Sequence, residues 1–194
     1  LIVNSLLDSG YVKGTENYDR KLAIDHEILI QFIKKSQKEN WEKLEEIHAE
    51  STRNEILRAL EKELESKSMI QVLRKGFLLS DIQINCAYFK PPSTINSDLQ
   101  WEYDQNILSI IRQLHYSKKN ENSIDLVFFL NGLPVATAEL KDYNKGHLDA
   151  IKQYREDRES NEKLLQFKKR AIVHFAVDPF EIYMTTKIDG EDTE

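Results

Sequence analysis

The chain has 194 residues, 40% of them hydrophobic and 31% charged, and a formal net charge of −6. This length suits one domain with a sizeable core, and no apolar run is long enough to cross a membrane, so we expect no membrane partner. The negative charge argues against a free-standing DNA clamp, because strong non-specific DNA binding needs clustered lysines and arginines. The basic runs are short and separated, and we expect each to be a solvated face: Lys34-Lys35, Lys118-Lys119 and Lys168-Lys169-Arg170.

The single cysteine, Cys86, excludes an intramolecular disulfide and lies in an apolar run, where we expect it to be packed. A lone cysteine fits a reducing compartment, and no signal peptide is visible, so we expect a cytoplasmic protein. The five histidines have no metal-ligand spacing. The sequence also has no G-x-x-x-x-G-K-[ST] loop, so this segment should not hydrolyse ATP by itself.

Apolar spacing predicts the elements of the first half of the chain. Residues 21–35 and 53–66 place apolar side chains three and four residues apart, which predicts two helices. Residues 77–89 are rich in Leu, Ile, Tyr and Phe and are predicted to be strand. Asp98 is predicted to cap a helix over residues 99–114. The residues of that helix expected to face inward are Ile107, Leu108, Ile110, Ile111 and Leu114.

A hairpin comes next, in which two apolar runs flank an Asn131-Gly132 turn. The first run carries Asp125, and the second ends with Glu139 and Lys141. Charged side chains inside a strand are costly unless they are paired or bound to a metal. The spacing is that of the D…(D/E)-x-K pattern of metal-dependent nucleases. From spacing alone, a surface hairpin with charged, solvated ends is an open alternative.

The chemistry of phosphodiester hydrolysis explains these residue types. A divalent cation polarises the phosphoryl oxygen and lowers the pKa of the attacking water, and Mg²⁺ prefers a few hard oxygen ligands. Asp125 and Glu139 would supply carboxylates, and the backbone carbonyl of Leu140 would add a third oxygen. Lys141 would orient the water and offset negative charge in the transition state.

The register of the hairpin tests this hypothesis. With a strict two-residue turn and a regular ladder, Leu130 pairs with Leu133 and Glu139 points to the side of the sheet opposite Asp125. A three-residue loop that pairs Leu130 with Pro134, or a bulge before Glu139, brings the two carboxylates to the same side. The nuclease hypothesis therefore predicts one extra residue in this hairpin.

After the hairpin, we predict a helix from His147 to about Arg158 and strands near residues 171–178 and 181–186.

Several stretches match the motifs of one family. They are Arg112-Gln113-Leu114-His115-Tyr116-Ser117, Asp125-Leu126-Val127, Asn131-Gly132-Leu133-Pro134, Glu139-Leu140-Lys141, Ala150-Ile151-Lys152-Gln153-Tyr154-Arg155-Glu156-Asp157-Arg158 and Val173-His174-Phe175-Ala176-Val177-Asp178. With these motifs, the chain resembles the N-terminal nuclease domain of the R subunit of type I restriction-modification enzymes, a member of the PD-(D/E)xK superfamily. The resemblance extends over nearly the whole chain.

The resemblance implies an α/β fold with a restriction-endonuclease-like core, a mixed sheet flanked by helices. We assign this nuclease core to residues 71–194 and a helical N-terminal portion, packed with the core, to residues 1–70.

The resemblance also implies a set of catalytic residues, which are Asp125, Glu139, Lys141 and Gln153. Gln153 stands where the family has the glutamine of a Q-x-x-x-Y motif. The chain departs from that motif, because Asp157 occupies the tyrosine position and the nearest tyrosine, Tyr154, follows Gln153 directly.

The function implied is that of a Mg²⁺-dependent DNA endonuclease domain, with Mg²⁺ as the cofactor and duplex DNA as the substrate. The family implies ATP-driven translocase domains elsewhere in the full-length subunit, and modification and specificity subunits as partners. One alternative is a non-catalytic docking domain that anchors the motor to its methyltransferase partner. Another is a stand-alone repair or recombination nuclease.

Overall fold

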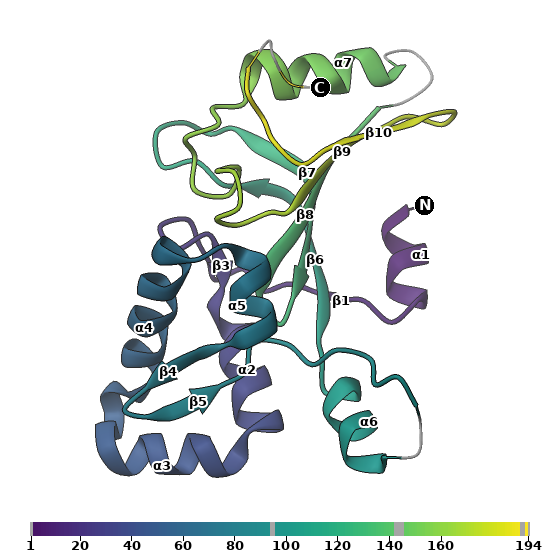
Figure 1. Ribbon diagram of the computed structural model, residues 1–194. Helices are drawn as coiled ribbons and strands as arrows, with labels where there is room; N and C mark the ends of the chain where they lie inside the picture. The colour runs from purple at the N-terminus through teal and green to yellow at the C-terminus, as the bar shows by residue number, and fades with distance from the viewer. Residues whose placement is uncertain (1, 94–95, 142–145, 191–192, 194) are drawn as a thin grey trace.

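The computed structural model describes residues 2–93, 96–141, 146–190 and 193. At its centre lies a six-stranded sheet in the order β1-β6-β7-β8-β9-β10 (Figure 1). The β1–β6 and β8–β9 pairs are parallel and the other neighbours are antiparallel. The strands are β1 (Val12–Lys13), β6 (Leu108–His115), β7 (Ser123–Leu130), β8 (Leu133–Leu140), β9 (Val173–Val177) and β10 (Ile182–Thr185). Helices flank this sheet, so the predicted mixed α/β, restriction-endonuclease-like architecture is confirmed.

Helices and two small hairpins make up the rest of the described fold. The helices are α1 (Ile2–Asp8), α2 (His26–Ser36), α3 (Lys38–His48), α4 (Thr52–Ser66), α5 (Met69–Lys75), α6 (Ser97–Asp104) and α7 (Gly146–Lys152), with a 3-10 turn at Ala49–Ser51 and a π-helical segment at Gln153–Asp157. The small hairpins pair β2 (Tyr18–Asp19) with β3 (Ile24–Asp25) and β4 (Phe77–Leu79) with β5 (Ile82–Ile84). Among the ranges given above, no helix has the length and apolar character needed to span a membrane.

The helices α2 to α5 and the β4–β5 hairpin enclose the largest apolar core, at the lower left of Figure 1. The predicted helix over residues 53–66 is confirmed as α4. The predicted helix over residues 21–35 begins late, because Ile24–Asp25 pairs as a short strand and the Asp25 side chain accepts a hydrogen bond from Ile28 N at the start of α2. The strand predicted over residues 77–89 is shorter than expected and forms both strands of the β4–β5 hairpin.

The Asn131-Gly132 turn docks this helical core onto the sheet. Both residues have positive φ, 52° and 79°, as a two-residue type I′ turn requires. The fully buried Asn131 side chain accepts from Ile107 N at 2.6 Å and donates to Cys86 O at 3.0 Å. A Cβ atom at Gly132 would lie 2.2 Å from the backbone oxygen of Asp25, so this position requires glycine.

The hairpin contains the extra residue that the sequence predicted, and it takes the form of a β-bulge. Leu130 pairs with Leu133, so the expected alternative pairing of Leu130 with Pro134 is wrong. The register then shifts between Phe128 and Phe129, and Val135 becomes the additional residue on β8. Beyond the bulge Leu126 pairs with Ala138, and the next position along the ladder sets Asp125 opposite Glu139.

The helix predicted over residues 99–114 is wrong. Helix α6 ends at Asp104, and residues 108–115 form β6, between β1 and β7 in the sheet. The apolar residues taken as a helical stripe instead satisfy their backbone groups in the ladder with β7, where β-branched side chains pack well. Asp98 is not the cap, since the Asn96 side chain accepts from the backbone nitrogens of Asp98 and Leu99.

The last third of the chain follows the sequence prediction closely. The predicted helix from residue 147 to about 158 is present as α7 and the π-helical segment, and both predicted strands are present as β9 and β10. Tyr154 of the π-helical segment packs into a second core, together with residues of β6 and β7. Helix α1 covers the opposite face of the sheet, in a third cluster with Leu126 and Ala138.

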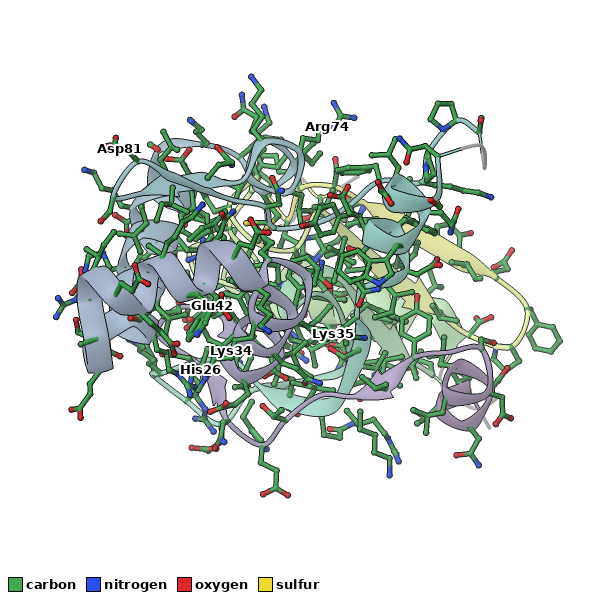
Figure 2. The ribbon with its side chains drawn as sticks, turned by 90° about the horizontal axis from the view of Figure 1, so that it is seen from below. His26, Lys34, Lys35, Glu42, Arg74 and Asp81 are labelled. Carbon is green, nitrogen blue, oxygen red and sulfur yellow. The ribbon has the colours of Figure 1, made fainter. Side chains whose placement is uncertain are left out.

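Two of the short basic stretches can be located among the described residues. Lys34 lies over the ring of Trp41 at 4.4 Å. In Figure 2, His26, Lys34 and Lys35 lie well apart from Arg74. The expectation of a solvated face is wrong for Arg170, which is 1% exposed and donates from Nε to Leu22 O at 2.6 Å.

Candidate metal centre

Three neighbouring strands bring the candidate side chains into one row across the sheet. Gln113 of β6 lies between the pairs Arg112–Leu126 and Leu114–Ile124, and is therefore opposite Asp125 of β7. The bulge sets Asp125 opposite Glu139 of β8. Opposite residues of an antiparallel pair project to the same side, so Gln113, Asp125 and Glu139 share one face.

The Asp125 carboxylate is held through both of its oxygens. Oδ1 accepts a hydrogen bond from Gln113 Nε2 at 2.7 Å, and Oδ2 accepts one from the backbone nitrogen of Leu140, also at 2.7 Å. The second bond brings the backbone of Leu140 against the carboxylate. The structure therefore brings together Asp125 and Leu140, whose backbone carbonyl was the predicted third oxygen ligand.

The Glu139 side chain is 1% exposed and forms an ion pair with Arg158. Its Oε1 accepts from Arg158 Nη2 at 2.6 Å and from Nε at 3.1 Å. Nη2 also donates to the backbone oxygen of Ser123 at 2.7 Å, and the guanidinium lies over the ring of Tyr116 at 5.8 Å. Arg158 thus ties the segment that follows α7 to both β7 and β8.

Burial raises the pKa of the Glu139 carboxyl to about 7. The Arg158 guanidinium acts in the opposite direction, and the neighbouring Asp125 carboxylate raises the pKa further. Two carboxylates held this close repel one another when both are ionised, and a divalent cation between them relieves that repulsion.

This donor set fits Mg²⁺, which takes hard oxygen ligands and usually retains several waters. Within the part of the chain that the structure describes, no group of three Asp, Glu, His or Cys side chains could hold a metal. The other ligands would therefore come from the Leu140 carbonyl, from water and from the substrate.

Lys141 directly follows β8, and its backbone nitrogen donates to Val177 O at 2.8 Å, which extends the ladder with β9. Side chains alternate along an extended strand, so Lys141 projects to the same side as Glu139, two residues earlier. The structure thus places Asp125 and Glu139 on one face, and side-chain alternation predicts that Lys141 shares it.

Gln153 begins the π-helical segment, and its side-chain oxygen is buried without a hydrogen-bond partner among the residues placed in the structure. Single π-helical turns are frequent at functional sites. Asp157, at the family's tyrosine position, is exposed.

Tyr154 is buried, and its hydroxyl lies 2.8 Å from Thr137 Oγ1, which lies 2.8 Å from His174 Nδ1. Burial raises the pKa of Tyr154 and lowers that of His174 to about 4, so both side chains are neutral near pH 7. Thr137 precedes Glu139 by two residues on β8. Tyr154 therefore contacts the strand that carries Glu139, from a different sequence position than the motif tyrosine.

Sequence reasoning assigned no role to Gln113 and Arg158, which hold the two carboxylates. The prediction of a helix over residues 99–114 concealed that Gln113 occupies a strand position next to Asp125. Arg158 contacts Glu139 from 19 residues away, at the end of the π-helical segment, and sequence spacing does not predict this contact.

A comparison with protein families matches residues 15–193 to the model of the type I restriction enzyme R protein N terminus. A comparison with curated proteins finds no match.

Proposed function

Because this chain belongs to the type I restriction enzyme R protein N-terminus family, we propose that the Asp125–Glu139 pair is the centre of a Mg²⁺-dependent DNA endonuclease. The observation that carries this proposal is the bulge at Val135, which turns Glu139 to the side of the sheet where Asp125 lies. A buried Glu139 carboxylate next to the partly exposed Asp125 carboxylate is costly in a purely structural hairpin, and a bound cation would offset this cost.

In this proposal Asp125, Glu139 and the Leu140 carbonyl would hold Mg²⁺, which would polarise a phosphoryl oxygen and lower the pKa of a bound water. Lys141 contributes a positive charge that orients the attacking water and offsets charge on the phosphoryl oxygens. The side-chain oxygen of Gln153, which has no hydrogen-bond partner among the described residues, would accept a hydrogen bond from the same water.

The buried contacts of Tyr154, Thr137 and His174 support the strand that carries Glu139. They connect the π-helical segment to β8 and β9 through neutral hydrogen bonds. Tyr154 is in this proposal a positioning residue that fixes β8 relative to Gln153.

The natural substrate in this proposal is duplex DNA, delivered by ATP-driven translocase domains of the full-length subunit. The modification and specificity subunits of the restriction complex would recognise the DNA sequence. The formal net charge of −6 agrees with DNA loading by other parts of such a complex.

The test is a set of alanine substitutions in the complete restriction complex. Asp125→Ala, Glu139→Ala and Lys141→Ala should each abolish DNA cleavage, whereas ATP hydrolysis and translocation should persist. Gln153→Ala should cause a smaller loss, of about 1–3 kcal/mol in transition-state stabilisation, as is typical of one hydrogen bond. As a control, Asp98→Ala on exposed α6 should cleave normally.

The docking-domain alternative makes the opposite prediction. If the three severe variants cleave DNA normally but fail to assemble with the other subunits, then the carboxylate pair serves assembly and the nuclease lies outside this chain.

A further inference from the structure

A chain of hydrogen bonds through Ser123 links the partners of the two carboxylates. Gln113 donates to Asp125, and Arg158 donates to Glu139. Ser123 joins these two donors, because its hydroxyl donates to Gln113 Oε1 at 3.2 Å while its backbone oxygen accepts from Arg158. Each carboxylate is therefore held by a side chain that is itself held by Ser123.

Gln113, which donates to Asp125, has an unusual backbone conformation. Its φ is +46°, in the left-handed region that glycine favours, although it lies within a strand and keeps the ladder register on both sides. A non-glycine residue in this conformation is strained, and such strain persists where the surrounding structure determines it, often at functional sites. The side chain that results from this conformation reaches Asp125 Oδ1.

Arg158 holds the other carboxylate, that of Glu139, through one oxygen. Both of its hydrogen bonds to Glu139 end on Oε1, and none is made to Oε2. Its side chain is 7% exposed, so this ion pair is shielded from water on both partners. A guanidinium that also binds Ser123 O and contacts Tyr116 has few orientations available, and it fixes the orientation of Glu139 in turn.

We propose that Gln113 and Arg158 are positioning residues of the metal centre, each of which fixes one oxygen of one carboxylate and so orients the pair for a divalent cation. This inference rests on the proposed function of the pair. Neither residue contacts the cation, and their role is to orient the ligands before it binds.

The experiment measures Mn²⁺ affinity by electron paramagnetic resonance of the free ion, and the unfolding midpoint of the same samples. Gln113→Asn retains an amide and tolerates positive φ, but its side chain is one methylene too short to reach Asp125. Arg158→Lys retains the charge and loses the two-point contact with Glu139. We expect each variant to remain folded and to bind Mn²⁺ about 10-fold to 100-fold more weakly, as is typical for second-layer partners of metal ligands.

Backbone strain provides a matched control. Gln113→Gly removes both the strain and the donor, so Mn²⁺ affinity should fall without a loss of stability. Asp81 also has a positive φ, 62°, in the turn between β4 and β5, and Figure 2 shows it at the edge of the molecule. Asp81→Gly relieves comparable strain and should leave Mn²⁺ affinity unchanged.

The outcomes separate this inference from the proposed function. If the unaltered protein binds Mn²⁺ and Gln113→Asn or Arg158→Lys binds it equally well or more tightly, the positioning role of that residue is refuted while the metal centre stands. If the unaltered protein does not bind Mn²⁺, the metal centre is refuted together with the inference. In metal-free crystals of Gln113→Asn, the Asp125 carboxylate should leave its present orientation, and an unchanged orientation contradicts the role of Gln113.

Discussion

The ionisation of Glu139 should make the metal-free protein less stable as the pH rises. In the unfolded chain this carboxyl has its ordinary pKa of 4.5, whereas burial raises its pKa to about 7 in the folded protein. Between these values the folded protein keeps a proton that the unfolded chain has released. The free energy of unfolding therefore falls as the pH rises from about 4.5 to about 7, and the fall ends above the folded pKa.

The expected size of this effect follows from the two pKa values. One pKa unit corresponds to about 1.4 kcal/mol, so the shift from 4.5 to about 7 amounts to on the order of 3 kcal/mol. The discount for solvent screening is small, because the Glu139 side chain is 1% exposed. Arg158 works against this effect, and the sign of the result reports whether burial or the ion pair dominates.

Urea denaturation at a series of pH values between 5 and 8 measures this effect, with Glu139→Gln as the reference. The glutamine cannot ionise, so the difference in stability between the two proteins isolates the contribution of Glu139 from that of the other carboxyls. We expect the unaltered protein to lose stability relative to Glu139→Gln as the pH rises to 7. A constant difference, or one that grows in favour of the unaltered protein, refutes the conclusion that burial outweighs Arg158.

Three further substitutions test how the scaffold holds the centre. Asn131→Ala should destabilise the protein by about 2–3 kcal/mol in urea denaturation, since it leaves Ile107 N and Cys86 O without their partner; a loss below about 0.5 kcal/mol contradicts that role. Gly132→Ala should cost more than about 1 kcal/mol, because its Cβ meets the Asp25 backbone and its φ is positive, and normal stability would show that the turn is not docked there. Tyr154→Phe should cost about 1 kcal/mol through loss of the Thr137 contact, measured by thermal unfolding; greater stability would contradict it.

The sequence was sufficient to predict the carboxylate pair because its signals are local. The Asn131-Gly132 turn identifies the hairpin, and the alternation of side chains shows that one extra residue is needed to bring Asp125 and Glu139 together. Which residue is extra depends on packing. The structure keeps the tight turn, which docks against Asp25, and places the irregularity at Val135.

The sequence could not predict the residues that hold this pair, because their positions depend on long-range pairing. Apolar residues of 107–114 fit a helical stripe as well as a buried strand, and only the ladder with β7 decides between them. With the strand missed, Gln113 could not be placed beside Asp125. Arg158 lies at the end of a π-helical segment that spacing does not distinguish from a continuing helix.

Anomalous diffraction from crystals soaked in Mn²⁺ tests the proposed metal centre most directly. We expect one or more anomalous peaks between the carboxylates of Asp125 and Glu139, with the Leu140 carbonyl in the coordination sphere. Soaked crystals of Asp125→Asn, grown and measured in the same way, should show a weaker peak or none. At saturating Mn²⁺, a carboxylate pair that stays bound to Gln113 and Arg158 with no metal between its members would contradict the nuclease proposal.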